Sequence, residues 1–530
     1  MILHWSSNGL EFCRKNHKSC ALKSQHVSGL KLIDCKTYSL VPSSPGLQYV
    51  ALSYIWGQGN AAQIDRETST ILASTLPPVI SDVVQVTTTL GFQYLWVDQY
   101  CIDQDDPTSK HEQLNQMDLI YHNAELTIVA AAGNNQGHGL PGIDSRPRTV
   151  QRVARAGRYK IIETLADPDY KIRDSTWFTR AWTFQEGLLC RRSLVFTDDQ
   201  LYYECSAMNC HEAIASSVSN LHTQDYSTFN TSMRGTLHGT NLSHVSHHES
   251  FLKVQELLEQ YTARKLSYDD DSLNAFQGVL RHYRNQEGQE VRHLWGVPYI
   301  LHDAIIKHYS QHVEAYLLDG LCWRHVHSCW EEEKALQPKR RLNFPSWSWA
   351  GWAGTIQHDR EPHRHQISPF GSLLSSLRLE CHDPHFGTFH ETLMGCSTSA
   401  RPMFTYPKAL VFDALVVPPE AIELAASLED DGLQNHQWGV AGFPASLNLS
   451  RGPSSPSDFL AALHQEEYYG IFLGMDNRLG LKPTVNVFVL IVALSEEGAQ
   501  RCGMMTIHAP HLNSISSFIS GCPSRMVRLV

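Results

Sequence analysis

The chain has 530 residues, of which 42% are hydrophobic and 18% are charged, and its formal net charge is −11. This length allows about three domains of ~150 residues each. The acidic balance argues against nonspecific nucleic-acid binding and against an anionic membrane surface, because both need a basic footprint. No run of ~18 apolar residues predicts a membrane span, and the N-terminal residues lack a secretory pattern. We therefore expect a cytoplasmic protein without a nucleic-acid partner.

The thirteen cysteines are scattered along the chain, and their odd number suits free thiols in a reducing compartment. Cys13 and Cys20 flank His17, but this spacing matches no standard zinc pattern. A second group combines thiols and imidazoles at short spacing: Cys322, His325, His327 and Cys329. On a strand, Cys322 would face away from the other three. We expect no metal site, and a zinc site in the second group is the alternative.

Three short apolar runs alternate with helical patterns in the first third of the chain. The runs are residues 49–56, 94–102 and 125–132. Helices are expected over 78–90 and from Pro107 to Tyr121, whereas residues 1–48 are expected to be irregular apart from a short strand at 30–33. Strands that alternate with helices predict an α/β fold with a parallel sheet. Ligands of such sheets bind beyond the carboxyl ends of the strands.

The carboxyl edge of this sheet is expected to carry polar and aromatic residues from its first two strands. They are Trp56, Gly57, Asp98, Gln99 and Cys101. Residues 57–62 formally match the G-x-G-x-x-A pattern of dinucleotide folds, but the polar stretch after them does not begin the helix that this mechanism requires. Asp98 lies in an apolar strand and needs a partner. Two interpretations stay open, a structural carboxylate that holds loop amides and a site residue.

Residues 177–205 have the pattern of one helix followed by two short strands. Asp174 or Ser175 is a suitable cap for this helix. Trp182 and Glu186 are four residues apart and therefore share a helix face. Burial beside an indole would raise the pKa of Glu186 unless a partner compensates. From this segment alone, Glu186 is better explained as a surface charge or as the partner of a nearby arginine.

The remainder of the chain changes in composition twice. Residues 206–250 are rich in Ser, Thr, Asn and His and predict a polar linker or loop. Helices are expected at 251–266, 272–283 and 299–309, followed by three closely spaced tryptophans in 344–352 that suit a structural plug. Later strands are expected at 376–380, 409–417, 468–473 and 485–494. We therefore predict five regions: an N-terminal segment 1–48, an α/β domain 49–205, a linker 206–250, a helical and Trp-rich region 251–360, and a β-rich region 361–530.

Four segments, taken in order, resemble the fungal heterokaryon-incompatibility (HET) domain. They are YVALSYIWG at 49–57, LGFQYLWVDQYCIDQDD at 90–106, MDLIYHNAELTIVAAA at 117–132 and RAWTFQEGLLCRRSLVFTDDQLYYEC at 180–205. PSWSWAGW at 345–352 resembles a segment found downstream in many members. The resemblance implies a parallel-sheet fold that is TIR-like or flavodoxin-like. It also implies a role in non-self recognition and programmed cell death after incompatible hyphae fuse.

The HET domain is thought to be distantly similar to TIR domains, some of which cleave NAD with a glutamate four residues after a tryptophan. Trp182 and Glu186 have this spacing, so the resemblance makes Glu186 the catalytic candidate. Relatives often carry an acid four residues before Met117, where this chain has Gln113. The resemblance also implies candidate substrate-binding residues, namely Trp56, Gly57, Asp98 and Trp182. A carboxylate stabilises positive charge as the nicotinamide–ribose bond breaks. The resemblance therefore implies NAD as a candidate substrate, and neither a cofactor nor a metal is expected.

Three functional hypotheses follow from this sequence. The first is a HET-domain effector of cell death that hydrolyses NAD through Glu186. The second is a non-enzymatic signalling module that assembles on a protein partner or on itself, with the long C-terminal region as a sensor. The third is a metal-dependent hydrolase that uses the Cys322 to Cys329 group.

Overall fold

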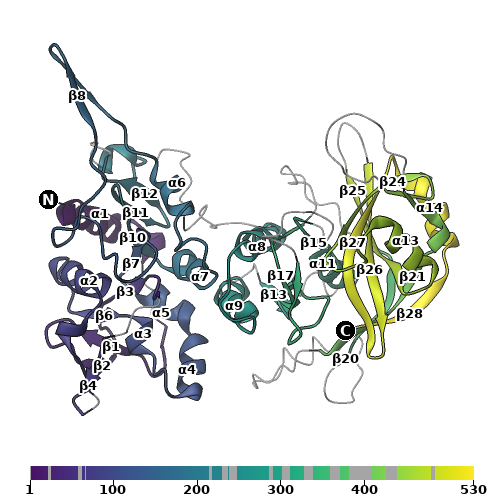
Figure 1. The fold of residues 1–530 in the computed structure, drawn as a ribbon, viewed down its shortest axis with the longest axis horizontal. Helices are drawn as coiled ribbons and strands as arrows, with labels where there is room; N and C mark the ends of the chain where they lie inside the picture. Colours follow the sequence, from purple (N-terminus) through teal and green to yellow (C-terminus); the bar gives the residue numbers. More distant parts are fainter. Residues whose placement is uncertain are drawn as a thin grey trace. The chain divides into compact units, whose positions relative to one another are not determined.

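The computed structural model divides into two compact units (Figure 1). Unit 1 comprises Met1–His244, Arg264–Leu266 and Asn274–Val279, and unit 2 comprises Val245–Ala263, Ser267–Leu273 and Leu280–Val530. The structure describes residues 2–21, 25–57, 62–65, 67–213, 218–228, 237, 247–285, 290–300, 311–327, 338–358, 371–380, 407–424, 438–478 and 484–530.

The core of unit 1 is an eight-stranded mixed sheet with the strand order β12-β11-β10-β7-β3-β6-β1-β2. Its four central strands are parallel neighbours: β6 (Tyr94–Trp96), β3 (Tyr49–Ser53), β7 (Leu126–Ala130) and β10 (Arg192–Phe196). The strands at both edges pair antiparallel. Strands β3, β7 and β10 are buried along their whole length, as short apolar runs predict for central parallel strands. The predicted α/β class with parallel strands is confirmed, and the sheet as a whole is mixed.

The N-terminal segment 1–48 is mostly ordered, which corrects the expectation of an irregular stretch. It contains α1 (Ile2–Asn16), the 3-10 helix η1 (Lys18–Cys20), β1 (Lys31–Asp34) and β2 (Leu40–Pro42). Strand β1, close to the strand expected at 30–33, pairs with β6 and β2. Leu10 and Cys13 of α1 are buried in the core of unit 1. The order of this segment depends on its packing against the core of unit 1. The hydrophobic periodicity of such a short segment does not reveal this packing.

The helices of unit 1 differ from the expected ones mainly at their ends. They include α2 (Pro78–Thr89), α3 (Asp98–Cys101), α4 (Pro107–Leu114), α5 (Met117–Asn123), α6 (Pro168–Arg173) and α7 (Trp182–Leu189). The strand expected over 94–102 was wrong beyond Trp96, because the chain turns into α3. The single helix expected from Pro107 to Tyr121 is two helices, and Asp106 caps the first through Thr108 N and Ser109 N.

Helix α7 begins at Trp182, five residues later than expected, and neither Asp174 nor Ser175 caps it. Ser175 Oγ instead accepts a hydrogen bond from Phe178 N in the preceding turn, at 3.2 Å. Two further strands of the main sheet follow this helix beyond β10, namely β11 (Leu201–Cys205) and β12 (Met208–His211). Helix α7 packs against β3 and α5.

A hairpin of β8 (Val153–Ala156) and β9 (Tyr159–Ile162) projects from the rest of unit 1 in Figure 1. All eight of its strand residues are exposed. Its apolar side chains include Tyr159 and Ile161, which are 62% and 57% exposed. The hairpin therefore contributes little to the core of unit 1.

Unit 2 combines helices and small hairpins with a ten-stranded sheet. Its first part contains α8 (His247–Thr262), most of α9 (Asp271–Arg284), β13 (Val291–Leu294), β14 (Val297–Ile300), α11 (Gln311–Leu321), β15 (Trp323–His325) and β18 (Ile356–His358). The helix expected over 299–309 begins as β14 instead, and residues 301–310 lie outside the described part. Trp347, Trp349 and Trp352 are buried, in agreement with a structural role.

The large sheet of unit 2 contains four strands that the sequence predicted in outline: β20 (Leu374–Glu380), β21 (Ala409–Val417), β25 (Tyr468–Arg478) and β26 (Thr484–Ser495). It also contains two strands that the sequence analysis did not predict, β27 (Gly498–Ala509) and β28 (Ser524–Leu529). Helices α13 (Pro456–His464) and α14 (Leu512–Gly521) pack against β25 and β27. Among the described residues, no helix is long and apolar enough to cross a membrane.

Candidate functional site

Glu186 is enclosed at the carboxyl end of β3. Its side chain lies on α7 and the residue is 5% exposed. Its Oε2 accepts a hydrogen bond from Ser53 Oγ at the end of β3. Ser53 Oγ in turn accepts a hydrogen bond from Trp177 Nε1 at 2.7 Å. Ser53 and Trp177 are 0% exposed, so this buried chain of hydrogen bonds fixes the carboxylate against the sheet.

Asp98 opens α3 just beyond the end of β6 and is half-buried. Both of its carboxylate oxygens lie 3.0 Å from Trp56 Nε1, which donates to them. Its Oδ1 also accepts a hydrogen bond from Gln99 N at 2.7 Å. Asp98 therefore accepts from the next backbone amide at the start of α3, and it also orients the Trp56 indole.

Both carboxyl groups have raised pKa values, and the charge of Asp98 contributes to the shift of Glu186. Burial raises the pKa of Glu186 to about 7, and the charge of Asp98 adds to this rise, while the Ser53 hydrogen bond and Arg180 oppose it. Burial likewise raises the pKa of Asp98 to about 6 against the hydrogen bonds from Gln99 and Trp56. Interacting carboxyls titrate as a pair. Groups that change charge near neutral pH are suited to acid–base or electrostatic catalysis.

The remaining predicted site residues lie at the same edge in different settings. Trp182 precedes Glu186 by one turn of α7, is partly buried and packs against the core of the sheet. Gly57 is exposed and has a left-handed φ of +72°, and a Cβ there would lie 2.5 Å from Asn135 Cβ. Only glycine fits this turn without a shift of the neighbouring chain. The structure thus shows Trp56 in contact with Asp98, and the Glu186 carboxylate near enough to Asp98 to be perturbed by it.

Sequence reasoning missed the groups that hold Glu186 and Asp98. Tyr121 contributes to the hydrogen bonding of Glu186, and its hydroxyl donates to Leu52 O at 3.0 Å. Arg180 is half-buried and lowers the pKa of both carboxyls by its charge. Ser53 had a visible signal, since it is the one small hydroxyl residue within its own apolar run, residues 49–56. Trp177 and Arg180 had none, because their roles depend on the turn that precedes α7.

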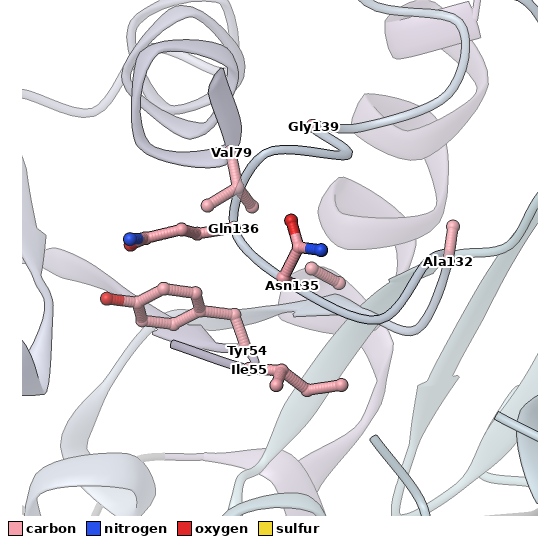
Figure 2. Close-up of a pocket in the computed structure, with 8 residues that line it drawn as sticks. Tyr54, Ile55, Val79, Ala132, Asn135, Gln136 and Gly139 are labelled. Atoms are coloured by element: carbon pink, nitrogen blue, oxygen red, sulfur yellow. The ribbon is translucent and has the colours of Figure 1, made fainter. Parts of the chain in front are cut away.

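A small pocket lies beside this site, at the ends of β3 and β7 (Figure 2). Its lining residues are Tyr54, Ile55, Val79, Ala130, Ala132, Asn135, Gln136 and Gly139. The cavity volume is ≈ 10 Å³, which is room for about one water molecule. Glu186 does not line this pocket. The pocket is therefore too small for a nucleotide and is separate from the carboxylate pair.

The described part of the Cys322 to Cys329 group does not form a metal site. Cys322 Sγ donates to Leu318 O at 3.2 Å, and His325 Nδ1 lies 2.6 Å from Ser450 Oγ. Among the described residues, Cys322, His325 and His327 are not grouped around a common point. Cys329 lies outside the described residues.

These features define an α/β domain with a buried carboxylate at the carboxyl edge of its parallel strands. Residues 49–186 match the family model of the heterokaryon incompatibility protein (HET), so the chain contains a HET domain. The matched region begins with β3 and ends at Glu186.

One related protein is "Heterokaryon incompatibility protein 6, OR allele" of Neurospora crassa. It is 26% identical over 208 residues, which are 29% of each chain, so this chain spans less than a third of that relative. No solved structure matches the chain.

Proposed function

We propose that this protein acts in fungal incompatibility-type signalling and that its HET domain cleaves the nicotinamide–ribose bond of NAD, with Glu186 as the catalytic residue. The HET match and the similarity to the Neurospora crassa protein support the signalling role. The observation that carries the chemistry is the buried Glu186, whose pKa of about 7 lets it change charge near neutral pH.

Strand order supports a nucleotide site at this edge. Numbered along the chain, the four parallel strands lie in the order 2-1-3-4. Flavodoxin-like sheets begin with the same order and bind their ligand at the carboxyl edge near the first and third strands. Ser53 ends the first strand here. The spacing of Trp182 and Glu186 on one helix resembles that of TIR-type enzymes that cleave NAD, which supports NAD as the nucleotide.

The proposed reaction is a hydrolysis in which water is the second substrate. The bond between ribose C1′ and nicotinamide N1 breaks, and nicotinamide leaves with the electron pair. The water oxygen then bonds to C1′, and one proton of that water is released. Ionised Glu186 stabilises the positive charge that develops on the ribose. Asp98 accepts the proton, and the cationic Arg180 attracts the pyrophosphate.

Substrate must reach a carboxylate that is 5% exposed. Asp98 and Trp56 are partly exposed and contact each other beside it. We therefore infer that the enclosed arrangement is the resting state, and that substrate entry separates the Trp56 indole from Asp98. Such a gate would keep the enzyme inactive until a partner or assembly opens the site.

The test is nicotinamide release by the purified full chain at high protein concentration. Wild type is expected to form nicotinamide and ADP-ribose in equal amounts, and Glu186→Gln is expected to lower the rate by about 10²-fold or more. Glu204→Gln is the matched control, because Glu204 is 1% exposed and lies on β11, away from β3 in the sheet. No release by wild type, or equal release by Glu186→Gln, overturns the enzymatic proposal.

A second candidate function is a non-enzymatic signalling module that assembles on a partner. The observation that favours it is the hydrogen bonding of the Ser53 hydroxyl, which donates to Glu186 and accepts from Trp177. Such bonding is expected of a structural contact. Expression in fungal cells separates the two candidates. Equal cell death with wild type and Glu186→Gln, without loss of cellular NAD, would favour assembly. Death and NAD loss that both require Glu186 would favour catalysis.

A further inference from the structure

Four buried side chains with metal-ligating atoms meet in unit 1. They are Cys13 on α1, His17, Cys20 on η1 and Cys205 on β11. Their three sulfur atoms and one ring nitrogen all lie within 4.8 Å of one another. A tetrahedral zinc site, with Zn–S near 2.3 Å and Zn–N near 2.0 Å, places neighbouring ligand atoms about 3.5–3.8 Å apart. The four atoms are thus already close to that arrangement.

We propose that Cys13, His17, Cys20 and Cys205 bind one structural zinc ion. Three thiolates and one imidazole are a common ligand set of closed, four-coordinate zinc sites. Soft sulfur ligands in a tetrahedral arrangement favour zinc over magnesium or calcium, which prefer oxygen.

The hydrogen bonds of His17 select the nitrogen that binds the metal. His17 Nδ1 lies 3.4 Å from Cys205 Sγ and faces the cluster. His17 Nε2 lies on the opposite side of the ring, 3.1 Å from Nε2 of the buried His222. Nδ1 therefore takes the metal, while Nε2–H donates to His222. Zinc-bound histidines usually donate their second ring nitrogen to a partner in this way.

The charges around the cluster support a bound metal. Arg191 and Arg192 have side chains only 4% and 3% exposed, and both form ion pairs with Glu125. Glu125 also pairs with Arg14, whose side chain is 38% exposed. The two buried arginines and Glu125 leave at least one net positive charge in a buried region. A zinc ion with three thiolates and a neutral imidazole carries one net negative charge. Buried charges need such compensation.

The two arginines also contact the proposed ligands directly. Arg192 Nε donates to Cys13 Sγ at 3.1 Å. Arg191 Nη1 and Arg192 Nη2 donate to Cys20 O at 3.0 and 3.1 Å. Hydrogen bonds to sulfur stabilise thiolates and orient zinc ligands. The arginines therefore form the outer shell of the site.

The proposed zinc ion would cross-link the N-terminal helix α1 to strand β11 of the main sheet. Three ligands come from one short stretch, Cys13 to Cys20, and the fourth comes from β11. Because His17 and Cys205 are 188 residues apart, no local spacing pattern reveals the set. A metal that closes such a long loop contributes its binding energy to folding.

The first experiment measures metal in the wild-type full chain, purified from zinc-supplemented cells after removal of any metal-binding tag. About one zinc ion per chain is expected. Replacement by cobalt is expected to produce the visible absorption of tetrahedral cobalt–thiolate sites. Less than a tenth of a zinc ion per chain together with no cobalt spectrum from the reduced protein overturns the proposal. A disulfide between any two of the three thiols in protein kept under reducing conditions also overturns it.

Single substitutions identify the residues that bind the zinc ion. Cys20→Ser and Cys205→Ser are expected to lose the metal, and His222→Ala is expected to weaken zinc affinity about 10–100-fold while the ligands remain. Cys210→Ser is the matched control, because it removes a buried thiol on the neighbouring strand β12, and it is expected to retain zinc. Zinc that persists in Cys205→Ser but is lost in Cys322→Ser would place the metal in unit 2 and contradict the proposal.

A measurement on wild type covers the case in which the ligand variants do not fold. With zinc bound, Cys13, Cys20 and Cys205 are expected to resist alkylation together. Chelation of zinc is expected to make the same three thiols reactive, as mapped by mass spectrometry. Alkylation that does not respond to the chelator contradicts a metal at these residues.

Discussion

Ser53 and Glu186 are 133 residues apart in the chain, yet the Ser53 hydroxyl donates a hydrogen bond to the Glu186 carboxylate. This bond connects the first strand and the last helix of the region that matches the HET family, residues 49–186. The same hydroxyl accepts a hydrogen bond from the Trp177 indole N–H. One small side chain thus holds both the candidate catalytic group and the turn that leads to its helix.

Replacing Ser53 by alanine is expected to destabilise unit 1 by about 1–3 kcal/mol. The reason is that Trp177 Nε1, which is buried, loses its acceptor, and Glu186 loses its donor. The measurement is urea unfolding of wild type and variant. Ser193→Ala is the control, since Ser193 is also 0% exposed but its hydroxyl makes a longer bond of 3.4 Å to Glu204 O. Equal losses in the two variants would contradict the role given to Ser53.

The Glu186→Gln variant is expected to lose less stability than wild type as the pH rises. The folded state raises the pKa of Glu186 from 4.5 to about 7, so between these values the folded protein binds more protons than the unfolded chain. Stability from this group is therefore full below pH 4.5 and declines up to about pH 7. The difference is on the order of 3 kcal/mol.

The measurement for Glu186→Gln is the free energy of unfolding at pH 5 and at pH 8. Because glutamine stays neutral, the variant should lose less stability than wild type between the two conditions. An identical pH dependence of the two proteins would show that Glu186 has an ordinary pKa in the folded state.

Asp98→Asn is expected to lower the rate of NAD cleavage, because it removes the proposed proton acceptor, and to move the pH profile of the remaining activity to lower pH. The charge of Asp98 contributes to the raised pKa of Glu186, so its removal allows Glu186 to ionise at lower pH. The proposed reaction needs ionised Glu186, and its rate in wild type should therefore rise through about pH 7. The measurement is nicotinamide release from pH 5 to 9. Asp103→Asn, which changes an exposed acid, is the control, and an unshifted profile for Asp98→Asn would refute the coupling.

Asp82→Ala is expected to destabilise unit 1 by about 1–3 kcal/mol, because it removes the acceptor of the Leu140 N–H and the partner of Arg146. Asp82 is 1% exposed, pairs with Arg146 and accepts a hydrogen bond from Leu140 N at 2.7 Å. The control is Asp169→Ala. Asp169 pairs with Arg173 on the surface, where both side chains are more than a third exposed, and less than about 1 kcal/mol is expected. Chemical denaturation of both variants checks the difference, and similar losses would contradict it.

Arg501→Lys is expected to destabilise unit 2 by about 2–4 kcal/mol. Arg501 is 1% exposed, donates to the carbonyls of Leu321 and Trp323, and lies 3.6 Å from the Trp323 ring centroid. A lysine ammonium cannot donate to both carbonyls and stack on the ring. The control is Arg525→Lys at an exposed arginine 5.1 Å from the Tyr469 ring. Thermal unfolding that shifts equally in both variants would exclude this role.

Several local features could be predicted because neighbouring residues determine them. The apolar runs at 49–56 and 125–132 became buried central strands, and Asp106 before Pro107 became a helix cap. The strand expected over 94–102 was wrong beyond Trp96 because Asp98 begins the helix α3. The Asp98 carboxylate accepts hydrogen bonds from the Gln99 amide and from the Trp56 indole. One of these two partners lies 42 residues away, beyond the reach of local periodicity.

The sequence by itself determined the class of the first domain, its parallel strands and the family to which residues 49–186 are similar. The class follows because short apolar runs alternate with segments of helical periodicity. The similarity to the family follows because four motifs occur in order. The tertiary structure decided that Ser53 and Trp177 hold Glu186, that α1 is ordered, and that Cys13, His17, Cys20 and Cys205 meet. These contacts join residues more than a hundred positions apart. Chain folding, and not local propensity, brings such residues together.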